Sequence, residues 1–238
     1  MLNEIRLTSD VFGTNGGVSF VINFDAKEIA SALGLSYKTV DEGCVMYAGD
    51  NSDNGLLFVT DSSNTLYLYP YVNGEKINQK EHYLTCTQYD CMFFYKKTEK
   101  NTVFGFDKKS NANAKKIFCA IGKGINVETG AELNGYIFSK LNSNTGYNVY
   151  THCVLLEDGT FEQKNASLSN ANNAYYSDKM VSLAPICVES ANVMMKNLYY
   201  PSLIPNQVTS HKEFAMNNKE YVMSAVYQAA DYRFIAEM

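Results

Sequence analysis

The chain has 238 residues, a mass of 26.6 kDa and a net charge of −5, with 46% hydrophobic and 19% charged residues. At about 100–200 residues per domain, this length gives one large domain or two small ones. The hydrophobic fraction excludes wholesale disorder. No segment approaches the roughly 18 consecutive apolar residues of a membrane span, and no basic segment leads into an apolar run at the start. We therefore expect a soluble globular protein without a secretory signal, and no membrane partner.

The positive charges are almost all lysines, with 18 Lys against two Arg, and the 25 Asn indicate the coding bias of an AT-rich genome. Arginine is the usual residue for bidentate contacts with phosphate and guanine. A pI near 5.3 also opposes binding by counterion release. Acids interrupt the lysines between Lys96 and Lys123, which favours a solvated hairpin face. We expect no nucleic-acid partner.

The predicted elements are a short helix, a long series of strands and a second short helix. The first helix, Ala26–Leu33, can be capped by Asp25 and ended by Gly34. The second, Ala191–Leu198, can be capped by Ser190. Between and after them, runs rich in Tyr, Phe, Val and Leu predict strands. In chain order these runs are Cys44–Ala48, Leu56–Thr60, Leu66–Val72, Met92–Tyr95, Thr102–Phe106, Tyr147–Leu156, Thr160–Gln163, Glu213–Met216 and Tyr221–Val226.

Turn pairs separate many of these runs. They are Asn54-Gly55, Asn73-Gly74, Asp158-Gly159 and Asn217-Asn218, and a longer turn lies at Lys97–Asn101. Asn, Asp and Gly tolerate the positive φ angles of tight hairpin turns, so we expect antiparallel hairpins. The predicted fold class is mainly β, with antiparallel hairpins that form β-sandwich or barrel-like lobes and two or three short helices.

Two segments without strand pattern interrupt the series. Gly122–Gly135 contains four glycines, and Lys164–Lys179 is rich in Asn, Ser and Ala. Compact domains seldom contain structureless loops longer than about 12–15 residues. We therefore divide the chain into β-rich lobes at 1–125 and 126–238; a single domain with a long loop is the alternative.

One segment has the spacing of a calcium loop. Asp50, Ser52 and Asn54 occupy positions one, three and five, Gly55 occupies position six, and Asp61 stands at position twelve. Strands rather than helices are predicted on both sides, however. A hairpin turn rich in Asn, Asp and Gly explains the same residues, so we predict no metal, with calcium as the alternative.

The cysteines and histidines give no strong metal or catalytic pattern. His82, Cys86 and Cys91 have a permissible zinc spacing, but no second pair of close cysteines accompanies them. His152 and Cys153 would point to opposite faces of one strand. We interpret the cysteines as reduced, buried and without cofactor; they are Cys44, Cys86, Cys91, Cys119, Cys153 and Cys187.

We also predict that the protein is not an enzyme. The three histidines lie outside any nucleophile motif, and no Gly-x-Ser-x-Gly or phosphate-binding loop is present. A pair of carboxylates for glycoside hydrolysis remains open, because such partners meet only in three dimensions.

Tyrosines are the predicted contact residues. In Leu66–Val72, leucines alternate with Tyr67, Tyr69 and Tyr71, and Pro70 favours an edge strand. A tyrosine face on an edge strand suits a subunit interface, and a core on both faces of the sheet is the equal alternative. Two further pairs lie beside polar or proline-containing segments, as contact residues on loops do; they are Tyr175-Tyr176 and Tyr199-Tyr200.

The last part of the chain resembles a known type of hairpin. Its segments are Lys196-Asn-Leu-Tyr-Tyr-Pro201, Phe214-Ala-Met-Asn-Asn-Lys-Glu-Tyr-Val222 and Tyr232-Arg-Phe-Ile235. They resemble the C-terminal hairpin of small virion structural proteins in phages of low-GC Gram-positive bacteria, in which an apolar-x-apolar-Asn/Asp-Gly-Lys-x-Tyr hairpin closes a β domain. Asn218 stands in place of the usual Gly, and Asn also accepts left-handed geometry. The resemblance covers about a fifth of the chain.

This resemblance implies a non-enzymatic structural or adaptor subunit of a phage tail or baseplate. Its partners would be other virion proteins and further copies of itself, and it would be located in the virion after assembly in the host cytoplasm. The alternative function is a carbohydrate-directed β protein, either a receptor-binding module or a glycan hydrolase.

Overall fold

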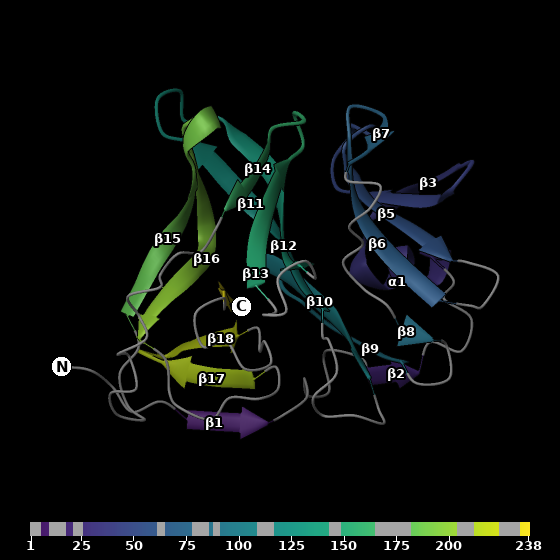
Figure 1. The fold of residues 1–238 in the computed structure, drawn as a ribbon. Helices are drawn as coiled ribbons and strands as arrows, with labels where there is room; N and C mark the ends of the chain where they lie inside the picture. The colour runs from purple at the N-terminus through teal and green to yellow at the C-terminus, as the bar shows by residue number, and fades with distance from the viewer. Residues whose placement is uncertain are drawn as a thin grey trace.

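The computed structural model describes residues 6–9, 18–20, 26–60, 65–77, 86–87, 91–108, 117–142, 149–164, 182–203, 212–223 and 234–238. In these ranges the chain forms one α-helix, one short 3₁₀ turn and two antiparallel sheets (Figure 1). The expected mainly β, antiparallel, sandwich-like fold is therefore confirmed. No helix in the described ranges is long and apolar enough to cross a membrane.

The large sheet is built from strands of both halves of the chain. Its path runs β1 (Arg6–Ser9), β17 (Lys212–Met216), β18 (Lys219–Met223), β19 (Ile235–Glu237), β16 (Val193–Leu203), β11 (Ile117–Asn126), β10 (Asn101–Lys108), β9 (Cys91–Lys97) and β2 (Val18–Phe20). From this path β12 (Glu132–Asn142) branches at β11 and continues to β13 (Val149–Leu156) and β14 (Phe161–Lys164), and β15 (Ser182–Val188) pairs with β16.

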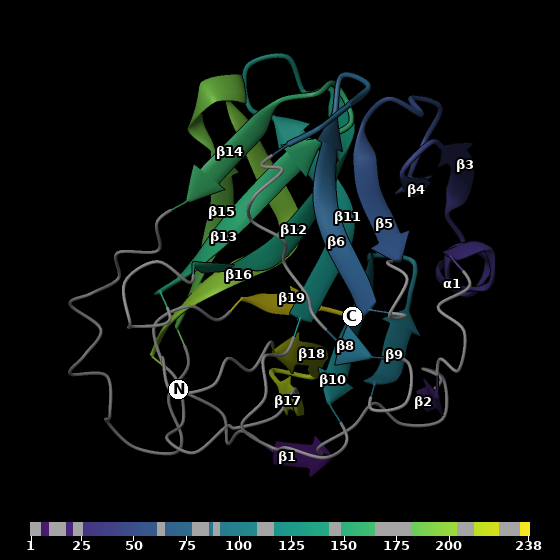
Figure 2. The same cartoon turned by 45° about the vertical axis from the view of Figure 1, so that its right-hand side comes forward.

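The small sheet is a local meander with the helix beside it (Figure 2). Its order is β3 (Ser36–Val40), β4 (Gly43–Tyr47), β5 (Gly55–Thr60), β6 (Thr65–Val72) and β7 (Glu75–Lys76), with β8 (Cys86–Thr87) also on β6. The helix α1 (Ala26–Leu33) contributes Ile29, Ala30 and Leu33 to the core. It ends as predicted, because Gly34 takes a φ of +69° and Leu35 N donates to Ala30 O.

The central strands of the large sheet are buried on both faces. On one face Phe104, Cys119, Tyr136, Phe138 and Leu155 join a cluster with Met46, Phe58 and Leu68 of the small sheet and with α1. On the other face Val103, Ala120, Ile137 and Val154 pack against Ile186 and Met195 of the β15–β16 hairpin. A strand segment with apolar partners on both sides needs apolar residues at every position, which explains the apolar runs Tyr136–Phe138 in β12 and Cys153–Leu156 in β13.

The second predicted helix is wrong. Ala191–Leu198 lies in the end of a 3₁₀ turn (Glu189–Ala191) and in β16, not in an α-helix. Asn192 and Asn197 take positive φ angles of 52° and 60°, and left-handed residues cannot continue a right-handed helix. Packing also favours the strand, because Val193, Met195 and Leu198 are buried in the same core cluster as Val103 and Ile137.

The loop expected at Gly122–Gly135 is also wrong. Gly122 pairs with Gly135 inside the long β11–β12 hairpin, whose turn spans residues 127–131. The glycines let other groups approach closely: a Cβ on Gly124 would lie 2.5 Å from Val193 Cγ1, and one on Gly135 would lie 2.6 Å from Met195 Cε. The expected lobe boundary therefore has no linker at this point, and the division into 1–125 and 126–238 stays a prediction.

A group of polar side chains joins the small sheet to the β13–β14 turn. Asn54 is 1% exposed; its Nδ2 donates to Glu157 O at 3.0 Å and its Oδ1 accepts from Asn73 N at 2.8 Å. Asn51 Nδ2 donates to the same Glu157 O, and Asn134 Nδ2 donates to the Glu157 carboxylate at 2.6 Å. We call these five residues the asparagine clamp.

Candidate functional site

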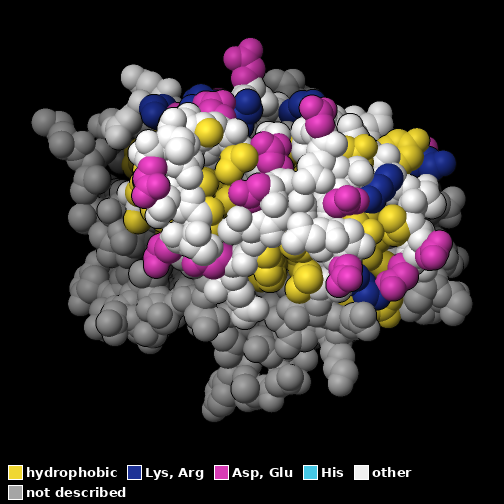
Figure 3. Space-filling model, turned by 90° about the horizontal axis from the view of Figure 1, so that it is seen from above, with side chains coloured by type: hydrophobic (Ala, Val, Ile, Leu, Met, Phe, Trp, Pro, Cys, Tyr) yellow, Lys and Arg dark blue, Asp and Glu magenta, His cyan; other side chains and the backbone are white. Residues whose placement is uncertain are grey.

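The outer face of the small sheet carries a second layer of apolar and aromatic side chains. This layer, the tyrosine face, consists of Val40, Val45, Leu57, Val59, Tyr67, Tyr69 and Tyr71. Register explains the grouping, because Val45 pairs with Leu57 and Leu57 pairs with Tyr69 across three strands. Seen from above, hydrophobic side chains gather there beside acidic and lysine side chains (Figure 3, right).

The tyrosines alternate as predicted, and their strand is an edge only in its middle part. Leu68 faces the main core while Tyr69 and Tyr71 face outward. β6 pairs with β5 along Leu66–Tyr71 and with β7 and β8 at its two ends. Pro70 fits between these short partners, and its carbonyl still accepts from Ile77 N at 3.0 Å. Within the described ranges no second strand pairs with residues 67–70, so this middle part of β6, which includes Pro70, is an edge.

Tyr69 and Tyr71 are only 8% and 9% exposed, and Tyr67 is half-buried. The rings of Tyr67 and Tyr69 stack with centroids 6.5 Å apart. The tyrosine face is therefore well packed within the chain itself, and whether it also contacts other subunits stays a prediction.

Two lysines lie over the tyrosine rings. Lys76 Nζ lies 5.0 Å from the centroid of Tyr69, and Lys38 Nζ lies 5.3 Å from that of Tyr71. Each lysine also has an acidic partner, Glu42 for Lys76 and Asp53 for Lys38. Burial raises the pKa of Tyr69, and the positive charge of Lys76 opposes this rise. This face thus accepts ammonium groups against aromatic rings.

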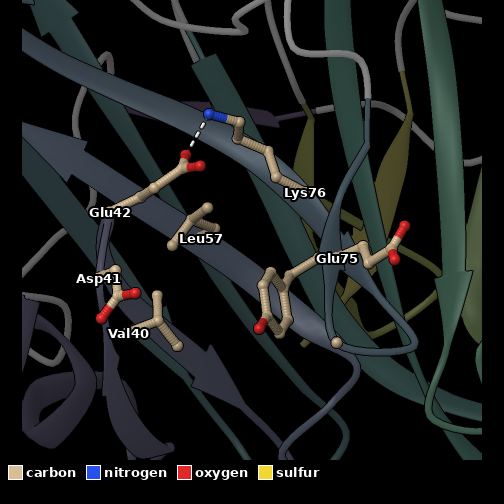
Figure 4. Close-up of a pocket in the computed structure, with 8 residues that line it drawn as sticks. Val40, Asp41, Glu42, Leu57, Glu75 and Lys76 are labelled. Carbon is tan, nitrogen blue, oxygen red and sulfur yellow. Dashed lines mark hydrogen bonds and ion pairs between the residues drawn. The ribbon is translucent and has the colours of Figure 1, made fainter.

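A pocket of about 440 Å³ opens on the tyrosine face (Figure 4). Its lining residues are Val40, Asp41, Glu42, Leu57, Tyr71, Gly74, Glu75 and Lys76. The Lys76–Glu42 ion pair joins β7 to the β3–β4 turn, although these elements lie at opposite ends of the sheet order. The outer face is therefore concave. The lining contains no Ser, Cys or His; its titratable side chains are Asp41, Glu42, Tyr71, Glu75 and Lys76.

The other predicted contact tyrosines are not part of this face. Tyr199 is half-buried against the third core cluster, and its hydroxyl donates to the Glu237 carboxylate at 3.4 Å. Tyr200 packs against the second cluster. Burial raises the pKa of both hydroxyls. Tyr175 and Tyr176 lie outside the described residues.

Sequence reasoning missed the charge cluster around Glu237. This side chain is 2% exposed, and its carboxylate lies 2.9 Å from Lys100 Nζ and 3.0 Å from Lys219 Nζ. Burial raises the pKa of Glu237, but the two lysine hydrogen bonds outweigh it, and the pKa is lowered. No local pattern indicates such a cluster, because its members come from three distant parts of the chain.

Of the lysines between Lys96 and Lys123 whose side chains the structure describes, Lys96, Lys100 and Lys123 are ion-paired. Lys96 lies 3.1 Å from Glu213, and Lys123 lies 3.3 Å from Glu132. Lys196 also reaches Glu132, and hydrogen bonds from these two lysines lower the pKa of that carboxyl group.

One of the ligands of the alternative calcium site, Asn54, already has another partner in the structure. Asn54, at position five of the loop, already accepts from Asn73 N, so its oxygen faces the asparagine clamp. Asp61 lies outside the described residues. Within the described ranges, no three His, Cys, Asp or Glu side chains are grouped as a metal site would require. Cys44, Cys119, Cys153 and Cys187 are free thiols. His82 lies outside these ranges, as do the side chains of Cys86, Cys91 and His152.

Comparison with known proteins identifies no relative. No model of a protein family, no curated protein and no solved structure matches the chain.

Proposed function

We propose that this protein is a non-enzymatic structural or adaptor subunit of a phage particle, associated with the tail or baseplate, that acts through contacts with other virion proteins and with itself. The observation that supports this proposal best is the arrangement of the segments that resemble virion proteins. The β17–β18 hairpin pairs through β19 with β16, so all three segments contribute to one end of the large sheet.

The hairpin has the geometry that the resemblance implies. Asn217 and Asn218 both take positive φ angles, 53° and 63°, so Asn218 performs the role of the usual Gly. The rings of Phe214 and Tyr221 stack across the hairpin with centroids 5.2 Å apart. Its apolar side packs on Ile235, which joins the hairpin to the body of the sheet.

Purified particles test this proposal. We expect quantitative mass spectrometry of gradient-purified virions to recover the chain at a fixed ratio to a known tail protein. Recovery from the host lysate but not from the particles would contradict a structural role. Turnover of cell-wall polysaccharide that disappears in a folded Asp or Glu variant would contradict the non-enzymatic part.

A carbohydrate-directed function is the second candidate. The pocket favours it because the Asp41 carboxylate can accept hydrogen bonds from sugar hydroxyls. However, Tyr69 and Tyr71 do not offer a flat exposed ring for a sugar to stack on, since each is less than a tenth exposed. Retention of the isolated protein on immobilised host glycans would favour this second function.

A further inference from the structure

We infer that two copies of this chain pair through β3, the first strand of the small sheet, as antiparallel neighbours around a two-fold axis. This inference goes beyond the proposed function and rests on it in one respect, namely that copies of the chain meet in a particle. Three properties of β3 carry it: an unpaired backbone edge, an exposed aromatic ring, and charges that complement each other in one register of the pairing.

One side of β3 has no strand beside it. β3 pairs with β4 along its whole length, and no described strand lies on its other side (Figure 2). Because a two-residue turn joins these strands, Val40 and Gly43 form a hydrogen-bonded pair, and alternate residues of β3 share this orientation. The backbone N–H and C=O groups of Tyr37 and Thr39 therefore point away from β4. They are donors and acceptors for a further antiparallel strand.

β3, all of whose residues the structure describes, lacks the usual protection of an edge strand. A projecting charge, a proline or a bulge commonly prevents pairing with another chain. β15 is protected in this way, since it contains Pro185 and two shifts of register against β16. β3 pairs with β4 without a shift. Its one lysine, Lys38, lies over the ring of Tyr71 and pairs with Asp53, so its charge is held on the face of the sheet and not at the edge.

An exposed aromatic ring stands on the same strand. Tyr37 is 44% exposed, and among the described residues Val127 is the only other large hydrophobic residue that is exposed. Lys27 of α1 lies with its Nζ 5.9 Å from the centroid of the Tyr37 ring. A second strand beside β3 would cover this ring, and cross-strand pairs with an aromatic member stabilise a sheet. Tyr37 therefore adds an apolar contact to the backbone hydrogen bonds of the edge.

Symmetry and charge select the register of the pairing. Because Tyr37 and Thr39 carry the outward backbone groups, a two-fold pairing can centre on Tyr37, on Lys38 or on Thr39. Centring on Lys38 puts it directly opposite the same lysine of the other copy, and like charges in that position are destabilising. Centring on Tyr37 puts Thr39 opposite Leu35, whose N–H already donates to Ala30 O. The pairing centred on Thr39 has neither fault.

The register centred on Thr39 also brings opposite charges together. Asp41 of each copy then lies opposite Tyr37 of the other copy, whose ring Lys27 already covers. The same aspartate is next to the position opposite Lys38, and it makes no ion pair within the described part of its own chain. The contact occurs twice by symmetry. This self-complementarity favours a second copy over an unrelated strand as the occupant of the edge.

Sedimentation equilibrium of the full chain tests this inference. We expect a monomer–dimer equilibrium over roughly 1 μM to 1 mM protein. Thr39→Pro removes the central outward N–H and leaves the hydrogen bonds to β4 intact, so it should weaken the dimer at least about tenfold. Thr39→Val, the matched control, keeps the N–H and a β-branched side chain and should change the dissociation constant by less than about threefold. The melting temperature of each variant reports whether it folds.

Charge and disulfide variants test the register. Asp41→Lys should weaken the dimer about fivefold, because it brings like charges together twice, and adding Lys27→Glu should restore most of the affinity. In a Cys187→Ser background, Thr39→Cys should form an intermolecular disulfide under mild oxidation, since directly opposed Cα atoms lie about 5.5 Å apart. Ser36→Cys is the control, because its symmetry mate lies several residues away along the partner strand.

A chain that stays monomeric over this range, or a dimer that Thr39→Pro leaves unchanged, would overturn the inference. Equal crosslinking of the two cysteine variants would overturn the register. A monomer whose Tyr37 and Thr39 amide signals shift when another particle protein is added would assign the edge to that protein instead. These results are independent of the particle inventory. A β3 dimer of a chain absent from virions would contradict only the proposed function, and a monomer recovered from virions would contradict only this inference.

Discussion

The buried carboxylate of Glu237 forms ion pairs with two lysines from other parts of the chain, Lys100 and Lys219. Since its folded-state pKa is lowered, the carboxylate stabilises the fold above the unfolded-state pKa of about 4.3, and this contribution is lost as the pH falls through the folded-state value. We expect Glu237→Gln to lower the free energy of unfolding by about 2 kcal/mol at pH 7. Urea denaturation of both proteins at several pH values should show that this difference shrinks below about pH 4.

Glu99→Gln is the matched control for this experiment. Glu99 is exposed in the β9–β10 turn, next to Lys100 in sequence, and makes no ion pair within the described structure. Its substitution should change stability by less than about 0.5 kcal/mol at any pH. A Glu237→Gln variant as stable as the native protein at pH 7 would show that the buried cluster contributes nothing.

Gly122 is required because a buried side chain occupies the space of its missing Cβ. A Cβ at this position would lie 2.2 Å from Asn101 Oδ1. Asn101 cannot move away easily, since its Nδ2 donates to Asn197 O at 3.2 Å and to Glu237 O at 2.6 Å. We expect Gly122→Ala to destabilise the protein by about 1–3 kcal/mol in thermal or urea denaturation.

A double-mutant cycle isolates this cause. In an Asn101→Ala background the Cβ that Gly122→Ala introduces no longer meets the amide, so the cost of this substitution should become smaller. An unchanged cost would point instead to Leu198, whose Cδ1 would lie 3.2 Å from the same Cβ.

At the scale of elements, the asparagine clamp attaches the small sheet to the β13–β14 hairpin. Asn54→Asp removes the donor to Glu157 O and places a negative charge at a side chain that is 1% exposed. We expect a loss of about 2–3 kcal/mol in unfolding free energy, measured by urea denaturation. Asn51→Asp removes a donor to the same oxygen at an exposed position, so its loss should be less than half as large. Equal losses would contradict the role that we assign to burial.

Elements set by local chemistry could be predicted from the sequence. The turns at Asn73-Gly74, Asp158-Gly159 and Asn217-Asn218 are present, and φ is positive at Asn73, Gly74, Gly159 and both residues of the last pair. The Asn54-Gly55 turn is different, because Gly55 already belongs to β5 and residues 48–54 form a longer connection. Asn54 belongs to the asparagine clamp instead. Its partner Glu157 is 103 residues away in sequence, and no local pattern indicates so distant a partner.

The candidate site could be predicted only in part, for the same reason. Alternation along Leu66–Val72 places the tyrosines on one face correctly. The pocket, however, depends on Glu42 meeting Lys76 and on the curvature of the whole small sheet. The helix predicted at Ala191–Leu198 failed likewise, since helical propensity is weak compared with the burial of Val193, Met195 and Leu198 between two layers.

At the scale of the whole molecule, the chemical accessibility of the cysteines measures whether the two sheets stay packed against each other. Cys119 is fully buried in the central layer, where burial holds the pKa of its thiol well above the ordinary range, while Cys187 is exposed on β15. We expect iodoacetamide to label Cys187 in the native protein and Cys119 only at denaturant concentrations that unfold it globally. Peptide mass spectrometry measures both sites. Labelling of Cys119 in native buffer would contradict the close packing of the two sheets.

The pairing of β1 with β17 has a consequence for biosynthesis. Arg6 pairs with Ala215, whereas all strands of the small sheet except β8 lie within residues 36–76 and pair mainly with their neighbours in sequence. Contacts between residues close in sequence form quickly and distant ones slowly, because the entropy of closing a long loop is lost before the distant contacts form. As the chain leaves the ribosome, the meander can fold early, while β1 must wait until β17 has been synthesised more than 200 residues later. Until then β1 is unpaired, and its free backbone N–H and C=O groups can pair with a strand of another chain.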